Sequence, residues 1–166
     1  MPVIAAIEDL EKYINQVGEC LVHPASGQTD ITSLLASGSL AERRQCALQW
    51  ARELHLAKKA FLHPVSGLQE ALISWRKFTL VYPGQSNQPL NLDEDGLLGV
   101  IRWYGAGSRR ALLQMSGMPA GRFTAALNGL QMKMLVTVCG TGEDEEGRTM
   151  ECYDLTDNWL PDEFGI

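Results

Sequence analysis

The sequence lacks any long apolar run, and no uninterrupted stretch approaches the roughly 20 residues that a membrane-spanning helix needs. Its first residues also lack a basic segment followed by an apolar one. Glu8, Asp9 and Glu11 place negative charge there instead, which argues against an export signal. We therefore expect a cytoplasmic protein with no membrane partner.

Cysteine is scarce and unsuitably spaced for metal binding. The chain has four cysteines, and none of them forms a CxxC pair or a zinc-type spacing: Cys20, Cys46, Cys139 and Cys152. Cys139 and Cys152 could face each other across a hairpin, but free buried thiols are the preferred interpretation. Four cysteines that are not paired are typical of a reducing compartment.

Histidine is equally unhelpful for a metal site. His23 and His63 lie in two similar segments, 22–27 and 62–67, but no carboxylate or cysteine stands beside either at a helpful spacing. The similarity does not extend into the flanking residues, so we interpret the segments as two similar turns at strand ends. We expect no metal site and no cofactor.

The common catalytic motifs are absent as well. The sequence contains no GxSxG, no P-loop, no GxGxxG and no HExxH. The four tryptophans are expected in the core or at its rim: Trp50, Trp75, Trp103 and Trp159. Nothing in these motifs requires catalysis, so enzymatic activity is left undecided, with a preference against it.

Positive charge is in short supply in the C-terminal half. Residues 1–90 hold 8 Lys+Arg and 8 Asp+Glu, whereas residues 91–166 hold 6 Lys+Arg and 12 Asp+Glu, which accounts for the whole net charge of −6. Phosphate contacts supply most of the non-specific affinity of proteins for DNA. The excess of acid therefore argues against a simple DNA-binding protein.

Helical signals dominate the first sixty residues. Apolar spacing predicts a helix over 4–17 that stops at Gly18. Asp30 is suited to cap a short helix that runs to residue 35. Ser39 and Glu42 form a capping box that opens a longer helix.

Strand signals surround these helices. Segment 20–22 predicts a short strand, while segments 61–65 and 68–75 predict a hairpin that turns at 66–67. Segment 80–90 contains two prolines and a glycine and is the expected linker. The predicted domains are therefore 1–82 and 91–166, with one shared core as the alternative.

Three further helices are predicted after the linker. Asn91 followed by acidic residues is typical of a helix cap, and the helix 93–104 ends at a glycine-containing segment. Ser108 is suited to start a second, short helix that ends near Met115. Pro119 is suited to the first turn of a third helix.

The third helix has one apolar face, and the period then changes from helical to strand-like. That face consists of Phe123, Ala126, Leu127, Leu130 and Met134. Two strands are predicted next, 134–139 and 148–155, around the polar turn 140–147. Three helices followed by a hairpin form a winged helix-turn-helix. The expected fold class is α+β, with N-terminal helices and a β-hairpin followed by a C-terminal winged helix-turn-helix.

Six side chains are the candidate DNA contacts of this arrangement: Arg102, Arg109, Arg110, Arg122, Asn128 and Lys133. Arg109 and Arg110, at the start of the second helix, are placed for phosphate contacts, and Arg102 could add another. Arg122 and Asn128 are suited to guanine and adenine edges in a major groove. Small residues between them allow close approach to a groove, or equally to a helix of another protein.

The hairpin tip argues in the other direction. Four consecutive carboxylates follow Gly142: Glu143, Asp144, Glu145 and Glu146. Phosphates repel such a tip, so this loop is not expected to touch DNA.

A family resemblance covers most of the chain thinly. Segment 123–132, followed by a strand and then Tyr153 and Trp159, resembles a winged-helix segment of the AlkZ-type DNA glycosylases and their shorter relatives. Segments 8–18 and 50–74 are similar to the opening helix and the central tryptophan-basic stretch of the short relatives. The resemblance implies DNA repair by release of damaged bases. The Gln-x-Asp form of the family's catalytic motif has a counterpart by letter in segment 28–30.

Three functions remain open, in order of preference. The first is a DNA-associated, non-catalytic winged-helix protein whose partner is double-stranded DNA. The second is a protein–protein interaction adaptor that uses the winged helix to bind a protein partner, which the net negative charge favours. The third is a reduced DNA-glycosylase-like enzyme.

Overall fold

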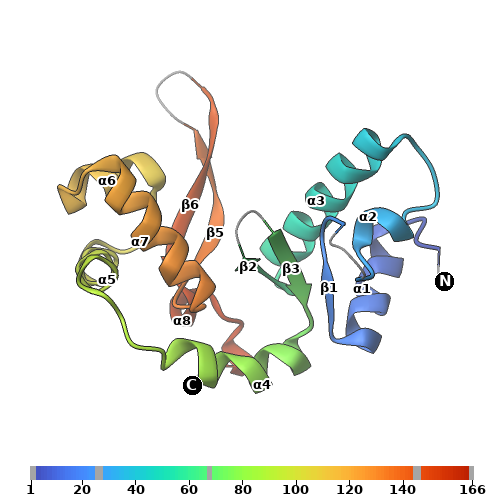
Figure 1. Ribbon diagram of the computed structural model, residues 1–166, viewed down its shortest axis with the longest axis horizontal. Helices are drawn as coiled ribbons and strands as arrows, with labels where there is room; N and C mark the ends of the chain where they lie inside the picture. The colour runs from blue at the N-terminus through green and yellow to red at the C-terminus, as the bar shows by residue number, and fades with distance from the viewer. Residues whose placement is uncertain (1–2, 25–27, 67–68, 144–146, 165–166) are drawn as a thin grey trace. The chain divides into compact units, whose positions relative to one another are not determined.

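A computed structural model describes residues 3–24, 28–66, 69–143 and 147–164. The chain divides into two compact units, Met1–Val81 and Tyr82–Ile166. Both units combine helices with a small antiparallel sheet (Figure 1). The expected α+β class is therefore confirmed.

The N-terminal unit contains a helix, a strand, two helices and a hairpin. In chain order these are α1 (Ile7–Val17), β1 (Glu19–Leu21), α2 (Ile31–Leu34), α3 (Leu40–Leu56), β2 (Phe61–Ser66) and β3 (Gln69–Ile73). Strand β3 lies between β1 and β2 and pairs antiparallel with both. Helix α4 (Trp75–Ser86) follows and spans the division between the units.

Local capping explains where the helices of this unit begin and end. Asp30 Oδ1 accepts a hydrogen bond from the Ser33 amide at 2.8 Å at the start of α2. Ser39 and Glu42 form the predicted capping box of α3, with the Ser39 amide 2.7 Å from Glu42 Oε2. Helix α1 ends at Gly18, whose φ of 89° is rarely adopted by residues with a side chain. These three predictions are confirmed.

The first helix starts later than expected. It was predicted from residue 4, but α1 begins at Ile7 because Ile4 forms an isolated bridge with Leu35. The Ile4 amide donates to the Leu34 carbonyl at 2.9 Å, and the Ile4 carbonyl accepts from Ala36 at 3.1 Å. The apolar side chain of Ile4 is therefore buried in the core, but it does not belong to the apolar face of a helix.

Helix α4 corrects the prediction of a strand to residue 75 and a linker from residue 80. The helix runs through Pro83, although a proline inside a helix costs about 3 kcal/mol. Phe78 and Tyr82, one turn apart, are both buried. The Tyr82 hydroxyl also donates to the Asp157 carboxylate within the C-terminal unit. Burial and this hydrogen bond outweigh the cost of the proline.

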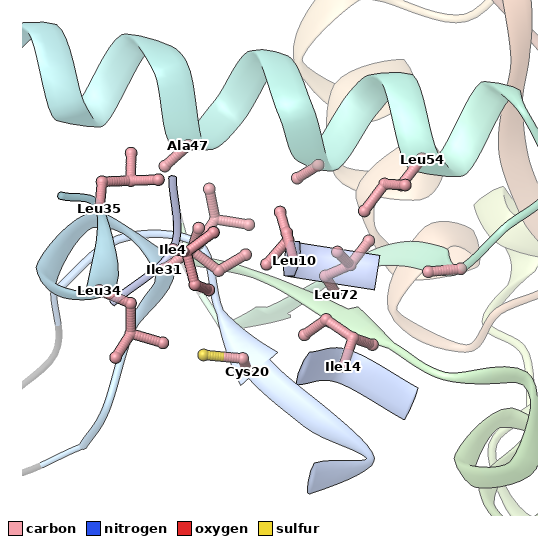
Figure 2. Packing of buried hydrophobic residues seen from close by; sticks show 13 residues of the cluster. Ile4, Leu10, Ile14, Cys20, Ile31, Leu34, Leu35, Ala47, Leu54 and Leu72 are labelled. Carbon is pink, nitrogen blue, oxygen red and sulfur yellow. The ribbon is translucent and has the colours of Figure 1, made fainter. Parts of the chain in front are cut away.

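The core of the N-terminal unit is formed by side chains from both its helices and its sheet. Figure 2 shows side chains from α1, β1, α2, α3 and β3 converging on one apolar cluster. Its members include Leu10, Ile14, Ile31, Ala47 and Leu72, all buried. Leu10 and Ile14, two of the apolar residues whose spacing predicts α1, are therefore buried in this core.

His63 lies on β2 beside Phe61, with 6.2 Å between the ring centroids. Burial lowers the pKa of its imidazole to about 4, because a charged ring is poorly solvated there. Its pKa in the unfolded chain is about 6.5. The unfolded state consequently binds a proton first as the pH falls.

We expect the N-terminal unit to lose up to about 3 kcal/mol of stability through His63 as the pH falls from about 6.5 to about 4. Above pH 6.5 both states are neutral and the full stability is present. Urea denaturation at pH 7 and near pH 4.5 measures the loss. His63→Gln should show a smaller pH dependence than the wild type. Identical pH dependence in the two proteins would show that His63 does not contribute.

The C-terminal unit contains the next series of elements (Figure 1). These are α5 (Leu92–Tyr104), β4 (Gly107–Ser108), α6 (Arg109–Ser116), α7 (Ala120–Met132), β5 (Val136–Glu143), β6 (Thr149–Leu155), α8 (Thr156–Trp159) and the 3₁₀ turn η1 (Asp162–Phe164). Strand β6 lies between β4 and β5 and pairs antiparallel with both.

Capping signals again place the helices of this unit. Asn91 and Glu94 form the predicted capping box of α5. Ser108 caps α6, and Gly117 ends it in the left-handed region with φ of 62°. Helix α7 follows directly after Pro119. The predicted order of three helices and a hairpin is confirmed. The helix bounds shift by one or two residues, while the first strand of the hairpin ends four residues later than predicted.

The chain path after α7 differs from the prediction. Met134 was placed on the apolar face of the helix and at the start of a strand, but it lies between the two with φ of 56°. Strand β5 begins at Val136 and continues past Gly140 to Glu143, with an irregularity between Val138 and Gly140. Met134 is still buried, so its apolar character was interpreted correctly and its element was not.

The two units share one order of elements and one sheet order. In chain order the N-terminal unit contains α1, β1, α2, α3, β2 and β3. The C-terminal unit contains α5, β4, α6, α7, β5 and β6, which is the same order of helices and strands. In each sheet the last strand lies between the first two. Helix α3 is thus the topological counterpart of α7. The similar segments 22–27 and 62–67 do not reflect this repeat, because both belong to the N-terminal unit.

Helices long and apolar enough to cross a bilayer are not found in the part of the chain that the structure describes.

Candidate nucleic-acid interface

The candidate side chains are carried by α6, α7 and the end of α5. Helix α7 buries Phe123, Leu127 and Leu130 against the core of its unit. Its opposite side is exposed and carries Arg122, Ala125 and Asn128, with Gly121 beside them. The short turn at Gly117 brings the first residues of α7 beside α6.

Arg109 is held in place at the start of α6. Its Nη2 donates to Thr124 Oγ1 at 2.6 Å, and its guanidinium carbon lies 5.6 Å from the centre of the Phe123 ring. The residue nevertheless stays exposed. Burial raises the pKa of Tyr153, and so does Glu151, whose carboxylate accepts a hydrogen bond from the Tyr153 hydroxyl at 2.8 Å. The nearby Arg109 opposes this rise. Arg109 is therefore a pre-oriented surface cation.

Arg122 is less available than the sequence indicated. Its Nε donates to Asp93 Oδ2 at 2.8 Å, and its Nη2 donates to Asp93 Oδ1. This bidentate contact with Arg122 lowers the pKa of Asp93 and raises that of Arg122. The pair joins the first turn of α5 to α7. Arg122 must release Asp93, at least in part, before it can contact another anion.

Three other candidates have no such competitor. Arg102, Arg110 and Asn128 are exposed, and none of their side chains makes a hydrogen bond or ion pair with another residue that the structure describes. Arg110 follows Arg109 in the first turn of α6, whereas Arg102 is in the last turn of α5. Two adjacent cations thus stand at the start of α6.

Lys133 is engaged inside the unit. Its side chain is 15% exposed, and Nζ contacts the Glu94 carboxylate, which is 6% exposed. Nζ also donates to the Pro89 carbonyl at 2.9 Å, while Glu94 Oε2 accepts the Asn91 amide at 2.8 Å. Lys133 thereby fastens the end of α7 to the start of α5. Its ammonium group is poorly placed to contact DNA.

Charge is distributed unevenly within the C-terminal unit. From residue 96 to residue 142 the sequence contains no aspartate or glutamate. The same stretch contains five basic residues, Arg102, Arg109, Arg110, Arg122 and Lys133. The acids lie in the first turn of α5 and from Glu143 onwards. Because salt screens charges over about 10 Å at 0.1 M, the local charge around α6 and α7 matters more than the net charge of −6. This signal was present in the sequence.

Other sequence candidates have structural roles. Asp30, the last residue of the segment that matches the glycosylase motif by letter, caps α2 and is buried. His23 Nδ1 lies 3.3 Å from Thr32 Oγ1. Among the described residues no group of three or more His, Cys, Asp or Glu side chains could hold a metal ion. The carboxylates Asp144, Glu145 and Glu146 lie outside the described residues, so the expectation for the hairpin tip stays a prediction.

Comparison of the chain with models of known protein families and with curated proteins finds no match. The resemblance to AlkZ-type glycosylases therefore rests on the sequence segments alone and stays a prediction.

Proposed function

We propose that the C-terminal unit is a winged helix-turn-helix that binds double-stranded DNA without catalysing a reaction. Helices α5, α6 and α7 would be its three helices, and the β5–β6 hairpin its wing. The short strand β4 beside β6 suits this interpretation, because it ties the start of α6 to the hairpin. The observation that carries the proposal is that the stretch 96–142 has no acidic residue and carries exposed arginines on α6 and α7.

Phosphate binding is assigned to Arg109 and Arg110. Both stand in the first turn of α6, where the helix dipole and unpaired amides also favour an anion. The contacts of Arg109 with Thr124 and Phe123 reduce the side-chain entropy that it would lose on binding. These two residues would supply affinity and orientation rather than sequence preference.

Base contacts are assigned to the exposed side of α7. Asn128 can donate to and accept from the major-groove edge of adenine. Gly121 and Ala125 are exposed on the same side and leave room for the helix to approach a groove. Arg122 has a secondary role, because a DNA group must compete with Asp93 for its guanidinium. Lys133 is left out because it is bound to Glu94.

The test is a salt titration of binding to a labelled random-sequence duplex, followed by fluorescence anisotropy. Affinity of the wild type should fall steeply between about 50 and 200 mM salt. Arg110→Ala should weaken binding severalfold and reduce the slope of log K against log salt by about 1, as expected for one lost phosphate contact. Lys12→Ala, which removes an exposed cation of α1, is the matched control and should leave both values unchanged.

A second variant changes affinity in the opposite direction. Asp93→Asn releases Arg122 from its ion pair and removes a negative charge beside α7, so it should strengthen binding. Absence of binding even at low salt would reject the proposal. Equal losses in Arg110→Ala and Lys12→Ala would show that only the overall charge matters and that α6 is not the contact.

A further inference from the structure

The outward side of α5 carries an apolar surface, and its first residues, Leu92 and Asp95, border Arg122 and Ala125 of α7. Leu97, Leu98 and Ile101 face the core. On the opposite side of the helix, Leu92 is 90% exposed and Trp103 is 84% exposed. Trp103 thus corrects the expectation that every tryptophan lies in the core or at its rim. Large exposed apolar side chains, tryptophan above all, are typical of interaction surfaces.

Two glycines separate these large side chains. Gly96 and Gly99 are exposed and lie between Leu92 and Trp103 on the same side of the helix. A Cβ added at Gly99 would meet nothing within 4 Å, so packing inside the unit does not require this glycine, whereas a Cβ at Gly96 would lie 3.3 Å from Met118 Cε of the same unit. A glycine in a helix interior costs roughly 0.5–1 kcal/mol relative to alanine. Close approach of another helix is a physical reason to accept that cost.

The order of large and small residues on this surface, large–glycine–glycine–large, reads the same from either end of the helix. The spacings from Leu92 to Gly96, Gly99 and Trp103 are four, three and four residues, which is the spacing of helices that pack along a common seam. When two copies of α5 run antiparallel, Leu92 of one copy lies opposite Trp103 of the other. Gly96 then lies opposite Gly99. Each large side chain meets a large one, and the glycines let the helix backbones approach in the middle.

Two charged residues at the edge of this surface also favour the antiparallel arrangement of the two helices. Asp95 and Arg102 lie along one edge, two turns apart, and both are exposed. Neither forms an ion pair with another residue in the described ranges. In an antiparallel pair related by a two-fold axis, Asp95 of each copy faces Arg102 of the other, which gives two ion pairs. In a parallel pair the edges that carry these residues would lie on opposite sides of the seam, so Asp95 and Arg102 of the two copies would not meet.

We infer that α5 is a dimer interface through which two copies of this chain pair antiparallel. The interface is isologous, because the same surface is used by both copies. Each Trp103 would bury on the order of 200 Å², but a single pair of short helices stays at or below about 1,200 Å², the lower limit of stable interfaces. The dimer is therefore weak, with a Kd of about 1 μM or above. It needs no DNA.

Sedimentation velocity over about 1 to 500 μM protein tests the inference. The wild type should shift from monomer to dimer as its concentration rises. Asp95→Arg or Arg102→Asp alone places like charges opposite each other and should weaken the dimer about tenfold. The double variant Asp95→Arg, Arg102→Asp reverses both charges and should recover most of the wild-type affinity. This recovery is expected only of the antiparallel pairing.

A glycine variant separates loss of the dimer from loss of the fold. Gly99→Gln removes a helix-interior glycine and meets no neighbour in the monomer, so the melting temperature at low concentration should stay the same or rise. Its side chain holds two helices apart and should abolish the dimer. Gly121→Gln, at an exposed glycine of α7 that also has nothing within 4 Å, is the matched control and should still dimerise.

Three results would overturn the inference. The wild type could remain monomeric over the whole concentration range. Gly99→Gln could dimerise as well as Gly121→Gln, which would place the interface on another surface. The double charge reversal could fail to recover affinity that both single changes had lost, which would exclude the antiparallel pairing.

Discussion

Leu127→Ala should lower the free energy of unfolding of the C-terminal unit by about 2–5 kcal/mol. Leu127 lies on α7, is 0% exposed and belongs to the apolar core that α5, α6 and β6 also line. Truncation removes buried methyl groups and leaves a cavity, because the surrounding helices can close it only in part. Leu130 is equally buried and should respond to the same change in the same way.

Hydrogen exchange of the α7 amides together with urea denaturation measures this loss. Exchange is needed because two units can unfold in separate transitions, so that one denaturation curve does not report on one unit. Leu92→Ala is the control, since Leu92 is exposed, and should change stability by less than about 0.5 kcal/mol in dilute protein. A loss below about 1 kcal/mol at both Leu127 and Leu130 would mean that α7 is not packed as described.

Elements with local signals could be predicted from the sequence. The capping boxes at Ser39 and Asn91 depend on residues only three positions apart, so the sequence contains the whole interaction. The buried face of α7 is similar, because one helix repeats its apolar residues at a fixed spacing. Gly18 and Gly117 mark helix ends by their own backbone conformation.

Elements that depend on distant contacts were missed. Strand β4 consists of Gly107 and Ser108 and exists only because it pairs with Cys152 and Tyr153 of β6. The second half of α4 falls in segment 80–90, which the sequence predicts as a linker because Pro83 is a helix breaker in isolation. Its buried residues, which outweigh that effect, find their partners in other elements.

The candidate site shows the same division. The sequence predicts which residues of α7 are exposed, but not which of them are already bound. Arg122 and Asp93 are 29 positions apart, and Lys133 and Glu94 are 39 positions apart. Such pairs depend on how α5 and α7 pack. The local absence of acid in 96–142 was visible in the sequence and is a better guide to charge than the total.

The contact between Glu94 and Lys133 makes Gly129 the most sensitive glycine of α7. A Cβ added at Gly129 would lie 2.1 Å from Glu94 Oε1 and 3.0 Å from Glu94 Cδ. The Glu94 carboxylate is buried and holds the Asn91 amide and the Lys133 ammonium group. Alanine at this position must displace it, which breaks the capping box of α5 and a buried ion pair together.

Gly129→Ala should therefore destabilise the C-terminal unit by about 2–4 kcal/mol, since breaking a buried pair costs about 3–5 kcal/mol and the better helix propensity of alanine returns about 1 kcal/mol. Gly121→Ala, in the same helix with nothing within 4 Å, should instead stabilise it by about 0.4–1 kcal/mol. The steric cause is tested in the background of Glu94→Ala. There the obstacle is gone, so Gly129→Ala should become neutral or stabilising, with an interaction energy above about 2 kcal/mol in the double-mutant cycle. If Gly129→Ala cost the same with and without the Glu94 side chain, the carboxylate would not be the reason for the glycine.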